Sequence, residues 1–441
     1  MESGKIVVAL VVVLGLLVVA AFWRYWLNIN PKFTMPPKEL PSPNAYDFYM
    51  RAFATVPKGE PFELPKLDPS QVRIPKPGES VQPRGLPGMM PQPEDKLTDP
   101  NASVSEKKAV LKDYEKGLAL LRQGFAYDYG HPRIVDFRQP LNEGFSEARK
   151  MARAFSAEAS IARKRGDFGK AIQFKIDGLQ LGCDTSKGRF IAALVGAVVN
   201  AIMAKDADQI VEHLSAEEAR SAARRLEGIL AKRVRPEEVF VEERLGSLGT
   251  LVAITSEPGW RFKMCNEDWD EENDREPTFL EIVGAKLASL TWSKRGLYSS
   301  LDKDTQAAVE RAKLPYSQLR TLPLPTSGTG ESVLASVDSA VFRLSGDKVI
   351  TDLLLLQLAL RAYKLEKGQY PATLSDLAPE SLSSIPNDPF GTGLYSYKLN
   401  GDSYQLYSFG PDCKDDGGAP LNTRNMQKDS LGDIVAGARE E

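Results

Sequence analysis

Aspartate side chains near the C-terminus have the types and spacing that suit a metal ion. Asp412, Asp415 and Asp416 stand close together, and Gly417 and Gly418 follow them directly. Three carboxylates this close repel one another unless a cation or solvent separates them. Calcium takes about six to eight oxygen ligands, so backbone carbonyls and a later acidic group would complete its shell. We therefore expect a calcium-binding loop here, with an acidic turn that holds no metal as the alternative.

The sequence lacks the motifs of common catalytic sites. Its two histidines, His131 and His213, have no partner at the spacing of a zinc site. No nucleophile elbow, Walker loop, dinucleotide fingerprint or His-Glu-x-x-His motif occurs. Three cysteines in so long a chain do not make a disulfide framework. We expect no enzyme activity, and keep as an alternative a hydrolase whose site is built from distant residues.

A second acidic stretch, residues 266–276, does not follow the pattern of an EF-hand. Counted from Asp268, the sixth position is Asn273 where glycine is needed, and the twelfth is Phe279 where glutamate is needed. We interpret this stretch as a solvated acidic loop.

The segments around the C-terminal acidic loop predict a long helix followed by a small antiparallel sheet. Residues 333–365 carry a broad apolar face at helical spacing. Apolar and polar residues alternate over 395–399 and again over 404–408, which is typical of a β-hairpin. Between them, Asn400-Gly401 predicts a type I′ turn.

The order of these features resembles the C-terminal domain of the major (G-type) pseudopilin of type II secretion. Residues 368–371 are Gly-Gln-Tyr-Pro, residues 385–391 are Ile-Pro-Asn-Asp-Pro-Phe-Gly, and the hairpin and acidic loop follow. The resemblance covers roughly a quarter of the chain. It implies a pilin-like helix and sheet with a bound calcium ion. By the same resemblance the ligands would be Asp412, Asp415, Asp416 and Asp433, with Ser408 beside them.

The chain departs from the pseudopilin pattern near its N-terminus. A pseudopilin has a peptidase site before its membrane span and a glutamate as the fifth mature residue, and neither is visible in residues 1–21. Charged residues such as Asp338 and Arg343 prevent the long helix from continuing into a membrane. We therefore expect only the soluble half of that helix, without ordinary processing and polymerisation.

An apolar run at the N-terminus predicts a membrane anchor. Ile6–Ala21 is unbroken, and Phe22 and Trp23 extend it before Arg24. Such a helix spans roughly 27 Å, close to the thickness of a bilayer core. We expect an uncleaved anchor over residues 1–29, with a cleaved signal peptide as the alternative. The count of flanking cations weakly favours a cytoplasmic body. Calcium favours the opposite, periplasmic side, which we prefer.

The rest of the chain divides by composition into two further parts. Residues 30–104 contain sixteen prolines and predict an extended linker, either a stalk or a ribbon along the body's surface. A short helix near residues 44–53 interrupts it. Residues 105–327 have helical periodicity and predict an α-helical domain. Within it, we expect residues 191–203 to form a buried central helix.

The basic residues Arg220, Arg224 and Arg225 follow a predicted capping box at Ser215 and Glu218. They form either a solvated face or a partner surface. A net charge of −3 gives no electrostatic case for binding nucleic acid.

These expectations combine into an α+β multidomain chain: a transmembrane helix, an α-helical domain, and a pilin-like helix with a small antiparallel sheet over residues 328–441. The function expected is that of a membrane-anchored envelope protein. It would act in protein–protein interaction or in a secretion or pilus-like assembly, with secretion components as partners. The alternatives are a free-standing extracytoplasmic binding module and the hydrolase named above.

Overall fold

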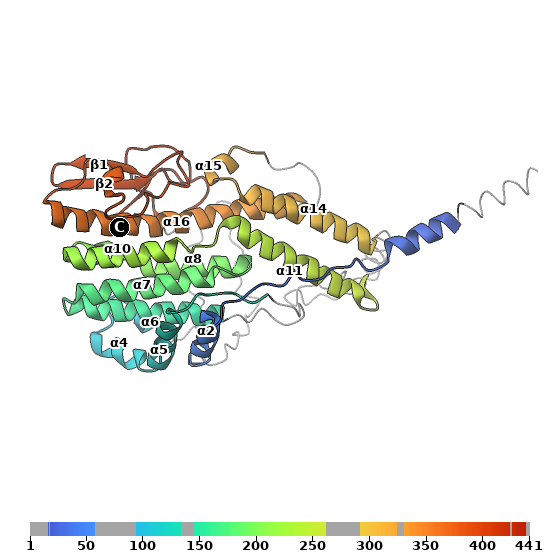
Figure 1. Ribbon diagram of the computed structural model, residues 1–441, viewed down its shortest axis with the longest axis horizontal. Coiled ribbons are helices and arrows are strands. Elements are labelled where there is room, and N and C mark those ends of the chain that lie inside the picture. The colour runs from blue at the N-terminus through green and yellow to red at the C-terminus, as the bar shows by residue number, and fades with distance from the viewer. Residues whose placement is uncertain are drawn as a thin grey trace, which may run out of the picture.

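Most of the chain folds into helices stacked in layers, with one small sheet at the edge (Figure 1). The computed structural model describes residues 16, 18–57, 94–133, 144–261, 292–323, 330–423 and 426–437, with side chains from residue 336 onward in the 330–423 segment. The helices are α2 (Ala45–Phe53), α3 (Asp95–Thr98), α4 (Val104–Leu111), α5 (Glu115–Gly124), α6 (Phe145–Lys164), α7 (Phe168–Thr185), α8 (Phe190–Ala204), α9 (Asp208–Val211), α10 (Ala216–Leu230), α11 (Pro236–Ser256), α14 (Lys294–Ala312), α15 (Tyr316–Leu319) and α16 (Gly330–Lys367).

Helices α6 and α7 form a helical hairpin. Gly166 ends α6 with φ +77°, a left-handed conformation that glycine adopts without strain. The Asp167 side chain then accepts a hydrogen bond from the backbone N–H of Lys170 and caps α7. The predicted capping box of Ser215 and Glu218 is also present, at the start of α10. The prediction of the capping box is therefore confirmed.

Helix α2 lies inside the helical body, although the sequence places it in a linker. Its residues Ala45, Tyr49 and Ala52 are fully buried against the rest of the fold. The Tyr49 hydroxyl donates a hydrogen bond of 2.7 Å to Asp184 Oδ2 in α7. The predicted helix near residues 44–53 is therefore confirmed, and it belongs to the core.

A three-stranded antiparallel sheet follows α16. Its strands are β1 (Ser396–Asn400), β2 (Ser403–Ser408) and β3 (Ile434–Val435), in the order β1-β2-β3. The hairpin is confirmed, but its turn is shifted by one residue. Asn400 pairs with Ser403, so the loop is Gly401-Asp402, and Gly401 has φ +60°. Glycine at the first loop position is the pattern of a type II′ turn.

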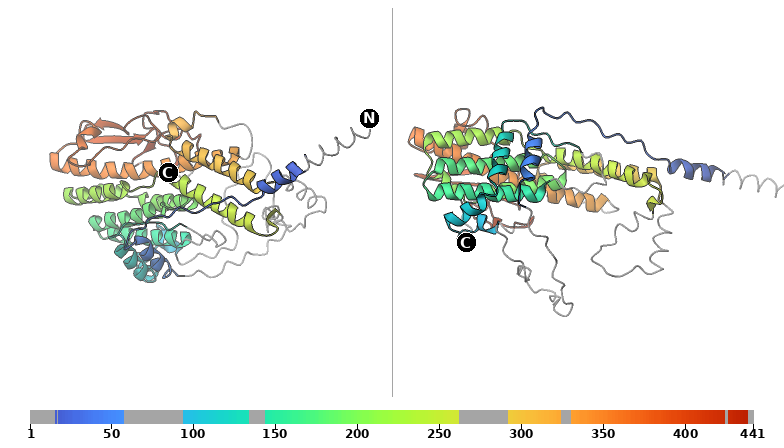
Figure 2. Two further views of the ribbon diagram at one scale, coloured as in Figure 1. Left: turned by 45° about the vertical axis from the view of Figure 1, so that its right-hand side comes forward. Right: turned by 90° about the horizontal axis from the view of Figure 1, so that it is seen from below.

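Helix α16 lies between the sheet and the helical layers. The sheet packs on one side of α16, and α8, α10 and α14 pack against the helix elsewhere (Figures 1 and 2). Its residues Leu356, Leu358 and Leu360 are fully buried. Buried residues from α2 through β3 form one continuous hydrophobic core. The regions predicted as separate helical and pilin-like domains therefore share that core.

The predicted membrane anchor at residues 1–29 is wrong for the part of the chain that the structure describes. Residues 18–27 are helical, yet no described helix is long and apolar enough to cross a membrane, which needs about 20 predominantly apolar residues. The centre of the Trp26 ring, at the end of this helix, lies 4.0 Å from the Arg295 guanidinium of α14. Residues 1–15 and 17 lie outside the described residues. The predictions of a transmembrane helix in the fold and of a single-pass protein with an extracytoplasmic body depend on this anchor. They are therefore wrong for the same reason.

Part of the predicted linker follows the body's surface. Residues 30–43 are extended, and Lys38 Nζ lies 3.2 Å from Glu242 Oε1 of α11. Arg133 Nη1 donates to the carbonyl of Pro36 at 2.6 Å. This segment therefore has the ribbon arrangement and is not a free stalk. Residues 58–93 of the linker and the acidic stretch at 266–276 lie outside the described residues.

Helix α8 is less buried than its sequence predicts. Ile191 is 48% exposed and Val198 is 47% exposed, while Ala193 and Val199 are fully buried. Helices α6, α7 and α16 cover the buried side. A helix that is apolar on all sides has no periodicity to indicate which face is covered, so the sequence alone could not predict this exposure.

Candidate functional site

A cavity of about 320 Å³ lies where α16 meets the helical layers, and we call it the α16 cavity. Its walls come from the C-terminal end of α7, from α8, from the α10–α11 connection, from the segment between α14 and α15, and from α16. Small-molecule sites have volumes of about 300–1,000 Å³, so the space is large enough for a compact organic ligand.

Apolar side chains form much of the wall of the α16 cavity. They include Val234, Leu314, Val341, Leu344 and Pro389. Tyr316 also lines it, with its ring packed against Phe342 and edge-on to Phe390. These walls suit a ligand with an apolar body.

Asn200 and Asp347 are polar members of the same wall. Asn200 is 1% exposed, and its Nδ2 donates a 3.2 Å hydrogen bond to Asp347 Oδ2. Gly182 of α7 leaves room for this amide, because a Cβ at that position would overlap Asn200 Oδ1. Asn200 Oδ1 and Asp347 Oδ1 are both buried and have no hydrogen-bond partner among the described residues. Unmet polar groups of this kind are rare in folded proteins.

Arg233 brings a cation to the cavity from the α10–α11 connection. Its Nη2 donates to Thr351 Oγ1 at 2.7 Å and to Asp352 Oδ1 at 3.0 Å. Asp352 also accepts from Lys348 and from the Tyr395 hydroxyl. The buried Nε of Arg233 has no partner within the described part of the chain.

Burial changes the protonation of two cavity residues. It raises the pKa of Asp347, against the opposing effects of Arg233 and of the Asn200 hydrogen bond. It raises the pKa of the Cys183 thiol to about 12, so that thiol stays protonated near neutral pH. The Ser186 hydroxyl donates to the Gly182 carbonyl at 2.9 Å. Neither Cys183 nor Ser186 is an activated nucleophile in this arrangement.

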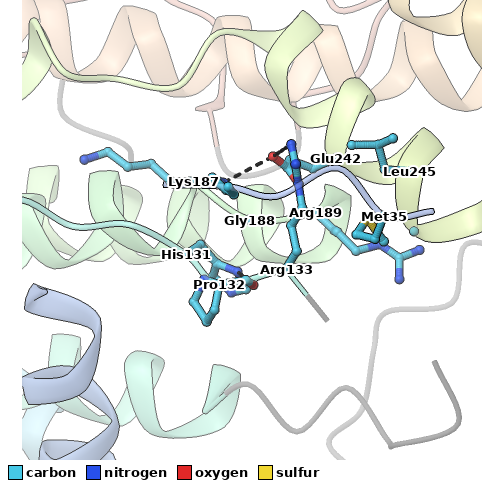
Figure 3. Close-up of a pocket in the computed structure, with 11 residues that line it drawn as sticks. Met35, His131, Pro132, Arg133, Lys187, Gly188, Arg189, Glu242 and Leu245 are labelled. Carbon is cyan, nitrogen blue, oxygen red and sulfur yellow. Dashed lines mark hydrogen bonds and ion pairs between the residues drawn. The ribbon is translucent and has the colours of Figure 1, made fainter. Parts of the chain in front are cut away.

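A second cavity, beside Glu242 of α11, is too small for an organic ligand. Its volume is about 20 Å³, enough for roughly one water molecule. Figure 3 shows residues that line it, among them Arg133, Arg189 and Glu242. Lys38 and Arg133 both donate to the Glu242 carboxylate, and the nearby Arg189 donates to Glu243. These contacts hold residues 30–43 and 131–133 against α11, which is a structural role.

The predicted calcium ligands Asp416 and Asp433 lie close together but bind backbone amides. Asp433 is fully buried, and its Oδ2 accepts from the N–H of Gly418 at 2.7 Å. Asp416 Oδ2 accepts from the N–H of Gly432 at 3.0 Å. The two carboxylates therefore connect the two sides of the loop through the backbone.

The other predicted ligands are also engaged by protein groups. Asp415 accepts from the Tyr407 hydroxyl at 2.8 Å, and Asp412 accepts from the N–H of Lys414 at 3.2 Å. The Ser408 hydroxyl donates to Asp388 Oδ1 at 2.7 Å. No three His, Cys, Asp or Glu side chains are arranged to hold a metal ion anywhere in the described segments. Calcium binding by this loop stays a prediction.

Sequence reasoning missed the residues of the α16 cavity. One signal was present, because Asn200 is a lone polar side chain in an otherwise apolar helix. Asp347 is one of several charged residues in the sequence of α16, and no local pattern distinguishes it from the others. Nothing local connects either residue to Arg233, which lies on a separate segment.

Comparison of the chain with protein-family models, with curated proteins and with solved structures finds no match. The resemblance of residues 328–441 to a pseudopilin domain stays a prediction.

Proposed function

We propose that this protein is a binding module whose α16 cavity holds a small molecule with an apolar body and a polar group. The observation that carries the proposal is the combination of space and unmet hydrogen bonding. The cavity has a volume of about 320 Å³, and Asn200, Asp347 and Arg233 in its wall each keep one buried polar atom without a partner in the described structure.

The unpaired atoms matter because each one destabilises the fold. A buried donor or acceptor without a partner costs about 1–3 kcal/mol. A ligand that supplies partners, after small rotations of these side chains, would offset that cost. It would also bridge α8 and α16, the two helices that Asn200 and Asp347 already connect.

Binding is favoured over hydrolysis by the state of the cavity's nucleophiles. The Cys183 thiol is protonated, and the hydroxyl proton of Ser186 is directed to a backbone carbonyl. His131 and His213 do not line the cavity. Acyl transfer needs a nucleophile within hydrogen-bond reach of a base, and these residues do not supply that pair.

A free-standing module is favoured over a subunit of an assembly by the surroundings of α16. The protein's own helices α8, α10 and α14 pack against α16, and its own sheet covers another side. A filament built through this helix would have to displace them. A role in a secretion or pilus-like assembly stays a prediction.

The test uses three probes with the same apolar body: hexylamine, hexanol and hexanoate. At millimolar concentration at least one should raise the melting temperature of the full chain. Ser345→Leu, which fills the cavity from α16, should abolish that rise. Ser256→Leu makes the same change at an exposed position of α11 and should leave it intact. If no probe stabilises the wild-type chain, the proposed function is wrong.

A further inference from the structure

Building on the proposed function, we propose that the molecule bound in the α16 cavity carries a primary ammonium group and that the Asp347 carboxylate accepts it. The proposal follows from how charges are paired in the cavity wall.

The cations of the cavity wall already have carboxylate partners. Their ion pairs are Arg233 with Asp352, Lys348 with Asp352, Arg235 with Glu237, and Lys313 with Glu310. The carboxylate Glu237 is thereby paired as well. A ligand anion would have to compete with these protein carboxylates.

Asp347 is the exception among the charged residues of the wall. It makes no ion pair with any described residue, and its one hydrogen bond comes from the neutral amide of Asn200. The nearby Arg233 directs its Nη2 to Thr351 and Asp352 instead. An ionised carboxylate has about four acceptor positions, so most of the capacity of Asp347 is unused.

A primary ammonium group matches what Asp347 lacks. It brings one positive charge and three N–H donors, which a carboxylate in an apolar surrounding binds by charge-assisted hydrogen bonds. A hydroxyl supplies a donor without the charge, and a second carboxylate would be repelled. The apolar residues Val341, Leu344 and Leu314 would contact the carbon chain of the same molecule.

Asn200 acts in this scheme as a positioning residue. Its amide holds Asp347 Oδ2 from the α8 side, and its own position depends on the space left by Gly182. It therefore orients the carboxylate without carrying the charge that the ligand recognises.

The experiment measures the dissociation constants of hexylamine, hexanol and hexanoate for the full chain by ligand-observed NMR. We expect hexylamine to bind at least about tenfold more tightly than either other probe. Asp347→Asn should bring hexylamine and hexanol to nearly equal affinity. Asp338→Asn changes the same residue type on the same helix, at a carboxylate bound by Arg311 outside the cavity wall, and should preserve the preference.

The outcomes separate this inference from the proposed function. If hexanol or hexanoate binds the wild-type chain as tightly as hexylamine, the cavity binds ligands but the ammonium assignment is wrong. If hexylamine keeps its advantage in Asp347→Asn, the assignment to Asp347 is wrong. If none of the three binds, both proposals fail. Circular dichroism of each variant checks that it is folded.

Discussion

Asn200 Nδ2 of α8 donates a hydrogen bond of 3.2 Å to Asp347 Oδ2 of α16, across 147 positions of sequence. This bond joins the helical layers to the helix that carries the sheet. Asp347 keeps its second oxygen buried without a partner in the described chain. The pair therefore connects two parts of the fold and also leaves one buried acceptor oxygen of Asp347 available to a ligand.

Asp347→Asn should stabilise the protein at neutral pH. Burial raises the pKa of Asp347 in the folded state, so unfolding releases a proton and stability falls as pH rises between the unfolded and folded pKa values. At neutral pH the cost of the buried charge is present, and asparagine removes it. We expect a gain of about 1 kcal/mol in the free energy of unfolding, measured by denaturant titration.

The matched control for this variant is Asp338→Asn on the same helix. Asp338 accepts from Arg311 Nε at 2.6 Å and Nη2 at 2.9 Å. Loss of that two-point ion pair should destabilise the protein by about 2 kcal/mol. A loss of similar size for Asp347→Asn would contradict the idea that burial of the Asp347 carboxylate, which forms no ion pair with a described residue, costs stability.

Gly182→Ala should destabilise the protein although alanine favours helices. A Cβ at this position would overlap Asn200 Oδ1, so α7 and α8 would have to separate or Asn200 would have to rotate. We expect a loss of about 1–3 kcal/mol on thermal or denaturant unfolding.

Gly228→Ala in α10 is the control for Gly182→Ala, and it should stabilise the protein instead of destabilising it. Nothing lies within 4 Å of a Cβ built at Gly228, so the change should stabilise the helix by up to about 1 kcal/mol. Equal effects of the two substitutions would show that the close approach of α7 and α8 has no energetic consequence.

Lys175 should make stability depend on alkaline pH. Burial lowers its pKa from 10.5 to about 8, reinforced by Arg163 and Lys205 and opposed by Asp206. Between these values the folded state has lost the proton while the unfolded state still binds it, so stability rises with pH. The gain is on the order of 3 kcal/mol.

The measurement compares wild type with Lys175→Met in denaturant titrations from pH 7 to pH 11. The difference between the two proteins isolates Lys175 from tyrosines that titrate in the same range. A wild-type curve parallel to that of the variant would refute the prediction.

The acidic loop should be insensitive to calcium. Asp433, Asp416 and Asp415 already accept hydrogen bonds from backbone N–H groups, and these bonds close the loop without a cation. Melting temperatures in millimolar calcium and in chelator should therefore agree. A rise with calcium would contradict this expectation and support the calcium site that the pseudopilin resemblance implies.

Asp433→Asn should nevertheless destabilise the same loop. The N–H groups of Gly418 and Asp416 now donate to the two carboxylate oxygens of Asp433. Asparagine keeps an acceptor for one of them and places its own NH2 donors against the other. We expect a loss of about 1–3 kcal/mol by thermal unfolding. The exposed Asp402→Asn, in the hairpin loop, should have almost no effect.

Several elements could be predicted from the sequence because their signals are local. The Gly166-Asp167 turn, the capping box at Ser215 and the long apolar face of α16 each depend on residues within a few positions of one another. The hairpin was also predicted, whereas its exact loop residues depended on the register between β1 and β2.

Local signals could not predict the partners of the basic residues Arg220, Arg224 and Arg225, which we call the basic patch. Arg225 donates to Asp177 Oδ1 of α7 at 2.6 Å, and Arg220 pairs with Glu366 of α16. Two of its three members are therefore engaged inside the molecule, and the patch is not simply a solvated face. The partner of each arginine lies on another helix, far away in sequence.

The sequence by itself determined the places of α2, α8 and α16, the cap that begins α10, and the place of the hairpin, because capping, periodicity and turn chemistry act over a few residues. Only the tertiary structure decided that residues from α7, α8, the α10–α11 connection and α16 surround one cavity. It also decided that the aspartates of the acidic loop turn toward backbone amides. Both outcomes depend on packing between segments that are far apart in the chain. Contacts of that kind produce no local or periodic pattern in the sequence, so the sequence alone could not predict them.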